Sequence, residues 1–89
     1  MNDDQFRLAL GAFQRGDMTT ARRAAQQQLG AAPAHAPSEH LLGLIECRAG
    51  QIDRGLVHLR RAVALDPANP GFRLMLARAL IDSGAGAEA

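Results

Sequence analysis

The stretch SEHLLGLIECRAGQIDRGLVHLRRAVALDP, residues 38–67, decides the fold of this chain. In its second half, apolar residues recur at steps of four, three and four positions: Ile52, Leu56, Leu59 and Val63. That spacing places them on one side of an α-helix, because the helix completes a turn about every 3.6 residues. The arginines of this segment fall off the apolar stripe and are expected to face solvent: Arg54, Arg60 and Arg61. The segment therefore predicts an amphipathic helix.

Glycine and proline mark the ends of two helices in this stretch. Gly50 follows the first helix, at the position where glycine commonly takes the left-handed conformation that ends a helix. Pro67 ends the second helix, because the residue before a proline is kept out of the helical region. Gly43 and Gly55 lie inside the two helices, where a missing side chain lets two backbones approach closely. The stretch therefore predicts two antiparallel helices joined by a short turn.

The same pattern returns 34 residues away in both directions without a gap. Equivalent residues include Gly16, Gly50 and Gly84, then Pro33 and Pro67, and then Ala21, Gly55 and Ala89. The pattern predicts helices at about residues 3–15, 18–30, 37–49, 52–65 and 70–83. No segment shows the period-two alternation of a strand, so the predicted fold class is all-α.

Small and helix-breaking residues at this spacing resemble the tetratricopeptide repeat, a pair of antiparallel helices. The resemblance treats residues 1–89 as one array, with repeats at 2–35 and 36–69 and a partial third repeat at 70–89. It implies helix-turn-helix repeats stacked as a short right-handed α-solenoid of five helices. The chain departs from the family pattern in lacking Trp and Tyr, and in having Gly55 where the family usually has alanine.

The three copies differ in the apolar surface that they contribute. The first has Ala25 in place of Leu59 and Gln28 in place of Ala62. We therefore expect a loosely packed outer repeat, in which Ala25→Leu has little effect compared with Leu59→Ala. In the third copy, residues 84–89 resemble the opening of a partner helix. Apolar residues surround most of the helix expected at 70–83, so one of its sides has no cover within the chain.

In tetratricopeptide proteins, the first helices of successive repeats line a concave groove in which peptides often bind. Carried over by register, the resemblance places these residues on the groove: Phe6, Leu10, Phe13, Gln14, His40, Leu44, Cys47, Arg48, Leu74, Arg78, Ile81 and Asp82. The best-known subclass grips a terminal carboxylate with Asn and Lys, but this chain has no Lys, and Leu10 stands at one Asn position. The mostly apolar set instead suits an apolar peptide or an amphipathic helix. Alternatively, Phe6, Phe13 and Leu44 fill gaps between helices, and the arginines are simply solvated.

The composition argues against nucleic-acid and membrane partners. A net charge of +1 gives no drive towards either. The pairs Arg22–Arg23 and Arg60–Arg61 lie on second helices and have no interleaved aromatic residues. No apolar run is long enough for a membrane span or a signal peptide, so a cytoplasmic location follows by default.

The sequence shows no catalytic or metal-binding constellation. His35, His40 and His58 lack the spacing of zinc ligands, so no metal or cofactor is expected. Cys47 is expected to be a half-buried, unreactive thiol. Ser38 has no Ser–His–carboxylate context and is interpreted as a helix-start residue. We therefore do not expect this segment to be an enzyme by itself.

Three functions fit these observations. The first is a protein-interaction module, or scaffold, whose concave groove binds a peptide or helix. The second is an N-terminal recruitment or dimerisation segment of a longer bacterial enzyme, since some bacterial transferases resemble this plan with repeats before a catalytic domain. The third is a homodimer in which Leu76 and Leu80, on the bare side of helix 70–83, pair with a second copy.

Overall fold

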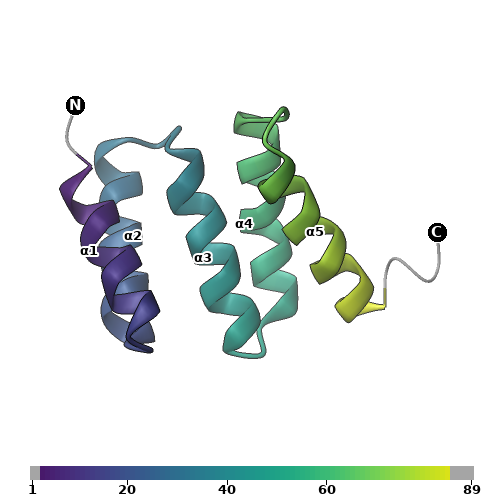
Figure 1. Cartoon of the computed structure of the whole chain (residues 1–89), viewed down its shortest axis with the longest axis horizontal. Helices are drawn as coiled ribbons and strands as arrows, with labels where there is room; N and C mark the ends of the chain where they lie inside the picture. The colour runs from purple at the N-terminus through teal and green to yellow at the C-terminus, as the bar shows by residue number, and fades with distance from the viewer. Residues whose placement is uncertain (1–2, 85–89) are drawn as a thin grey trace.

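Five α-helices make up the computed structural model, which describes residues 3–84 (Figure 1). They are α1 (Asp4–Gln14), α2 (Met18–Ala31), α3 (Ala36–Arg48), α4 (Ile52–Leu65) and α5 (Pro70–Ser83). The predicted ends differ from these by no more than one residue, and residues 3–84 contain no strand. The helices stack along the long axis of a body measuring 40 × 26 × 18 Å, with α1 and α2 at one end and α5 at the other. The predicted all-α repeat fold is confirmed. The expected opening of a further helix at residues 84–89 lies, apart from Gly84, outside the described residues.

Three glycines end α1, α3 and α5 in the same way. Gly16, Gly50 and Gly84 have φ values of 85°, 80° and 84°, which residues with a side chain rarely adopt. After the first two, the chain turns back on the helix end: the Asp17 N–H donates to the Ala12 carbonyl at 2.9 Å, and Gln51 repeats this bond one hairpin later. This bonding satisfies carbonyls that a helix end leaves unpaired. The glycine spacing in the sequence therefore reports a repeated backbone turn.

Side-chain caps or prolines mark the starts of α2, α3 and α5. The Asp17 carboxylate accepts a hydrogen bond from the Thr20 N–H at the start of α2, and the Asn69 amide oxygen accepts one from the Phe72 N–H at the start of α5. Pro70 opens α5, where its fixed φ suits the first helical turn. The start of α3 corrects the interpretation of Ser38. The cap position is His35, and Ser38 lies buried in the first turn.

The crossing of α3 and α4 depends on two glycines. A Cβ added at Gly43 would lie 2.6 Å from the Leu59 side chain, and one added at Gly55 would lie 2.5 Å from the Cys47 sulfur. Neither distance allows ordinary van der Waals contact. The predicted role of small residues at this crossing is therefore confirmed, and Leu59 fills the space that Gly43 leaves open.

The hydrophobic core is divided among successive neighbours rather than gathered at one centre. One cluster joins α1, α2 and α3, and contains Ala9, Ala12, Ala21, Ala24, Ala25, Leu41, Leu42 and Ile45. A second contains Ala36, Ala62 and Phe72, and a third contains Leu56, Leu59 and Ala79. These clusters place apolar contacts between each helix and the next, as expected for a stacked array.

The burial of Ala25 argues against the expectation of a loosely packed first repeat. Ala25 is 0% exposed within the first cluster, where α1, α2 and α3 meet. Gln28, whose polar side chain contributed to that expectation, is buried, and its side-chain oxygen accepts a hydrogen bond from the Phe6 N–H at 3.2 Å. A buried amide with a partner of this kind ties α2 to the start of α1.

Two polar pairs join neighbouring helices. Arg22 on α2 donates to the Glu46 carboxylate on α3 at 2.6 Å. Glu39 on α3 lies 2.7 Å from the ring nitrogen Nδ1 of His58 on α4. Both carboxylates are buried, and each is partnered, as buried charges generally are. Within residues 3–84, we find no helix with the length and apolar character needed to cross a bilayer.

Candidate functional site

A pocket of about 380 Å³ lies on the face that α1, α3 and α5 share. Its lining residues come from all three helices: Phe13, Leu44, Cys47, Arg48 and Met75. Four of these were predicted from the sequence as groove residues. The repeat register explains the convergence, because Phe13 and Cys47 occupy equivalent positions 34 residues apart, and Leu44 lies one turn before Cys47. Most of the lining is apolar, which suits an apolar side chain of a ligand.

Met75 is the lining residue that the sequence analysis missed. In the 34-residue repeat, Met75 is equivalent to Leu41, which is buried against the preceding hairpin, and it is not equivalent to any of the predicted groove residues. In α5 the same position packs against the cluster formed by Leu56, Leu59 and Ala79, and it also reaches the pocket. The equivalence of Met75 and Leu41 could have indicated a place in the pocket lining. A residue that faces the preceding repeat also lies next to the space between the first helices.

Arg48 forms the polar edge of the pocket. Its guanidinium carbon lies 4.5 Å from the centroid of the Phe13 ring, so the charge stacks on the aromatic face. No salt bridge joins Arg48 to an acidic residue in the described part of the chain. The contact with Phe13 places the guanidinium beside the pocket, where its N–H groups can donate hydrogen bonds to a ligand.

Cys47 is half-buried in the pocket wall. Burial raises the pKa of its thiol, and the negative charges of Asp82 and Glu46 raise it further. The thiol is therefore protonated near neutral pH and is a weak nucleophile. This agrees with the expectation of a half-buried, unreactive cysteine.

Comparison with known proteins identifies the repeat. A family model described as the tetratricopeptide repeat matches residues 46–89. Among solved structures, a point mutant of the O-GlcNAc transferase of Thermobaculum terrenum is similar at 35% sequence identity, with a TM-score of 0.87 over 90% of this chain. The chain is a tetratricopeptide-repeat protein. It spans 15% of the length of that transferase chain, and a search of curated protein sequences finds no match.

The remaining predicted groove residues of the tetratricopeptide array do not line the pocket. Phe6 packs edge-on against His35, with ring centroids 5.2 Å apart, and contacts the first core cluster. His40 stacks on Phe72 with centroids 4.6 Å apart, and burial lowers the pKa of its ring. These two side chains contribute to packing, as the alternative interpretation proposed for Phe6. The others are exposed and do not line the pocket: Leu10, Gln14, Leu74, Arg78, Ile81 and Asp82.

The fifth helix of the tetratricopeptide array has its exposed apolar residues at unexpected positions. Leu76 and Leu80, predicted to form a self-association surface, are half-buried and pack against the cluster that contains Leu56 and Leu59. The large apolar side chains that α5 exposes are Leu74 and Ile81, at 61% and 68%. A surface for a second copy of this chain would therefore centre on that second pair.

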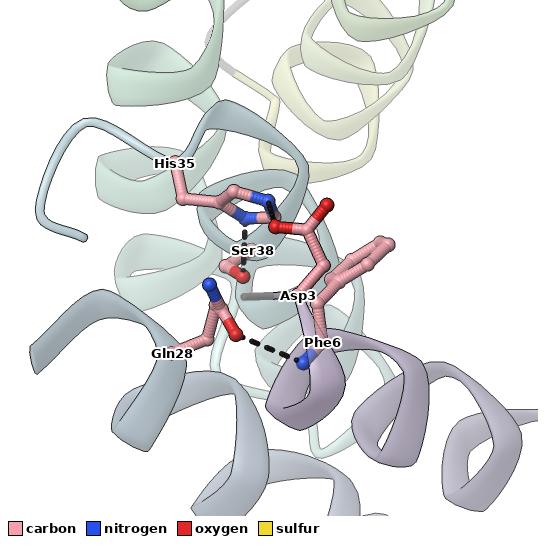
Figure 2. Close-up of polar contacts among 5 residues, drawn as sticks. All are labelled: Asp3, Phe6, Gln28, His35 and Ser38. Atoms are coloured by element: carbon pink, nitrogen blue, oxygen red, sulfur yellow. Dashed lines mark hydrogen bonds and ion pairs between the residues drawn. The ribbon is translucent and has the colours of Figure 1, made fainter. Parts of the chain in front are cut away.

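Three residues form a Ser–His–carboxylate alignment that the sequence analysis did not anticipate (Figure 2). The His35 Nδ1 lies 2.8 Å from the Ser38 hydroxyl, and its Nε2 lies 3.5 Å from the Asp3 carboxylate. The statement that Ser38 lacks such a context is therefore wrong. However, Ser38 is 0% exposed, so its hydroxyl cannot reach a substrate. The alignment joins the start of α1 to the start of α3 and has the geometry of a structural clasp.

A second pocket of about 310 Å³ lies between α3 and α4, beside the connection from α2 to α3. Its lining residues are Pro33, Glu39, Arg61, Ala64 and Leu65. The Glu39 carboxylate in this wall is already engaged by His58. Within residues 3–84, no three His, Cys, Asp or Glu side chains gather closely enough to hold a metal ion.

Proposed function

We propose that this chain is a protein-interaction module that binds an apolar segment of a partner protein in the pocket between α1, α3 and α5. The observation that supports the proposal is the lining itself, in which Phe13, Leu44 and Met75 present apolar surface to solvent beside Arg48. Tetratricopeptide repeats generally mediate contacts between proteins, and they are not catalytic in themselves. A pocket of this volume accommodates one or two side chains of an apolar peptide or of an amphipathic helix.

The single cysteine provides a direct test of this proposal. Peptides selected from a random display library on the purified chain are synthesised, and their binding is measured by fluorescence polarisation. A peptide in the pocket should slow alkylation of Cys47, because the thiol lies in the pocket wall. The double variant Phe13→Ala/Leu44→Ala should weaken binding at least tenfold, as expected for the loss of two apolar anchors.

The matched control is Val57→Ala/Leu65→Ala, which truncates two exposed apolar residues on α4. These residues do not line the α1–α3–α5 pocket, so binding there should be unchanged. Selected peptides that bind both double variants equally well, and that leave Cys47 alkylation unaffected, would refute the pocket as the binding site.

A second candidate is a recruitment segment of a longer enzyme. The similarity to a small part of a transferase supports it, because the match covers 90% of this chain and 15% of the transferase chain. We propose a bacterial, cytoplasmic parent protein on the same basis. Sequencing the gene beyond the codon for Ala89 tests the proposal. A stop codon at that point would count against it, whereas an open reading frame that encodes a catalytic domain would support it.

A third candidate is self-association through α5. The exposure of Leu74 and Ile81 favours it, since exposed apolar side chains of this size commonly mark an interface. If a dimer forms through this face, Leu74→Asp/Ile81→Asp should convert it to a monomer in sedimentation analysis. A wild-type chain that is monomeric at high concentration would dispose of this candidate.

A further inference from the structure

Three residues at one register position give the concave face an uneven charge pattern. Gln14, Arg48 and Asp82 are spaced 34 residues apart and lie in the last turns of α1, α3 and α5. All three are exposed. Successive repeats therefore present a neutral, a positive and a negative side chain at the same place, and a ligand lying across the groove meets them in that order.

The positive charge at the centre of this pattern is held beside the pocket. Arg48 stacks on Phe13 and lines the same pocket as Leu44. Its guanidinium carries N–H donors whose arrangement matches the two oxygens of a carboxylate. No acidic residue within the described part of the chain forms a salt bridge with it.

The acidic groups around the pocket do not replace such a partner. The Glu46 carboxylate forms a salt bridge with Arg22 on α2. Asp82 is near enough to raise the pKa of Cys47, but it lies on α5, where Arg78 stands one turn before it. Arg48 is thus the charged residue that lines the apolar pocket, whereas Asp82 lies outside the lining and its negative charge disfavours an acidic ligand group on the α5 side.

Building on the proposed function, we propose that the partner segment presents an apolar side chain to the pocket and an Asp or Glu side chain to Arg48. The apolar side chain contacts Phe13, Leu44 and Met75, and the carboxylate pairs with the guanidinium edge on the α3 side. This arrangement makes Arg48 a specificity-determining residue, which chooses among apolar segments by the charge beside the anchor.

Matched peptides test the proposal. A peptide selected on the wild-type chain is synthesised with Glu, Gln or Lys beside its apolar anchor, and with an amidated C-terminus so that only the side chain supplies a carboxylate. The Glu form should bind about five- to tenfold more tightly than the Gln form, with the Lys form weaker still. Arg48→Glu should reverse this order, and Asp82→Asn should not weaken the Glu form.

The control is Arg54→Glu, which reverses an exposed charge on α4 that does not line the pocket. It should leave the order Glu, Gln, Lys unchanged. Equal affinities for the three peptides, a Glu preference that survives Arg48→Glu, or binding only by peptides with a free C-terminal carboxylate would overturn the proposal. If Phe13→Ala/Leu44→Ala abolishes binding but Arg48→Glu does not change the order of affinities, the proposed function holds and this inference fails. If neither variant changes binding, the proposed function fails as well.

Discussion

The residues at the helix crossings show how two repeats fill equivalent space differently. In the second hairpin, Gly43 leaves room and the Leu59 side chain occupies it. In the first hairpin, the equivalent positions hold Ala9 and Ala25, both fully buried. One large and one absent side chain are thus exchanged for two small ones. At Gly43 there is no room for a methyl group, since an added Cβ would lie 2.6 Å from the Leu59 side chain.

Enlarging Ala25 should therefore destabilise the protein. Ala25→Leu introduces three carbon atoms into a fully buried position, and we expect a loss of about 1–3 kcal/mol in the free energy of unfolding from overpacking. Urea denaturation measures this, with Gln27→Leu on the exposed side of the same helix as the control. Wild-type stability in Ala25→Leu would mean that the first hairpin is loose after all.

Truncating Leu59 should be at least as harmful. Leu59 is fully buried against Gly43, and Leu59→Ala leaves a cavity that should cost about 2–5 kcal/mol. Val57→Ala on the same helix removes a side chain that is 46% exposed and should have a small effect. Similar unfolding midpoints for the two variants would show that the apolar stripe of α4 is assigned incorrectly.

His40 should make the fold sensitive to acid. Its pKa is lowered by burial, so the unfolded chain binds a proton at this ring more readily than the folded chain does. The stability contributed by the neutral ring is complete above its ordinary pKa and is lost as the pH falls through the lowered value. The melting temperature should fall as the pH drops below about 6.5, and it should fall less in His40→Phe, which keeps a ring on Phe72. An equal fall in both proteins would assign the acid sensitivity to other groups.

Residues that depend on spacing could be predicted, whereas residues that depend on contacts between distant segments could not. Gly43, Gly55 and Leu59 follow from helical periodicity and from the 34-residue repeat. The burial of Gln28 does not, because its hydrogen-bond partner is the Phe6 backbone on another helix. A glutamine among other glutamines carries no sign of such a partner.

At the scale of elements, the positive-φ glycines control where each first helix stops. Gly50→Ala would place a side chain at φ 80°, which should cost about 1–2 kcal/mol. Gly11→Ala in the last turn of α1 is the matched control. A Cβ there meets only the end of the Arg15 side chain, at 3.4 Å, and the change should stabilise the helix by up to about 1 kcal/mol. Thermal melts of the two variants should shift in opposite directions, and shifts in the same direction would contradict the assigned turn.

The same scale shows why only part of the candidate site was predicted. Register alone brought Phe13, Leu44 and Cys47 to one face, since equivalent positions of stacked hairpins point the same way. It could not show that His40 turns towards Phe72, because that contact depends on the angle at which α5 packs beside α3. The same limit applies to Ser38, whose clasp with His35 and Asp3 depends on the path of the connection between α2 and α3 (Figure 2).

At the scale of the whole molecule, the array presents one shared face built from helices far apart in the chain. The pocket on it needs α1, α3 and α5 together, so its shape depends on how the hairpins stack rather than on any one of them. The tetratricopeptide resemblance predicted this arrangement. The proposed preference for an acidic ligand group depends instead on Arg48, whose guanidinium lies over the Phe13 ring.

The division of the core into three clusters also means that the helices need not open together. A helix with exposed apolar side chains on its outer side, such as α5, is held less firmly than α3, whose residues enter the first cluster and border the third. Native-state hydrogen exchange should therefore be graded, with the amides of α5 losing protection before those of α3. Uniform protection factors across both helices would instead describe a single cooperative unit. With such a gradient, a ligand that bridges α3 and α5 would slow exchange most in the weaker helix, and the rate in α5 would report occupancy of the groove.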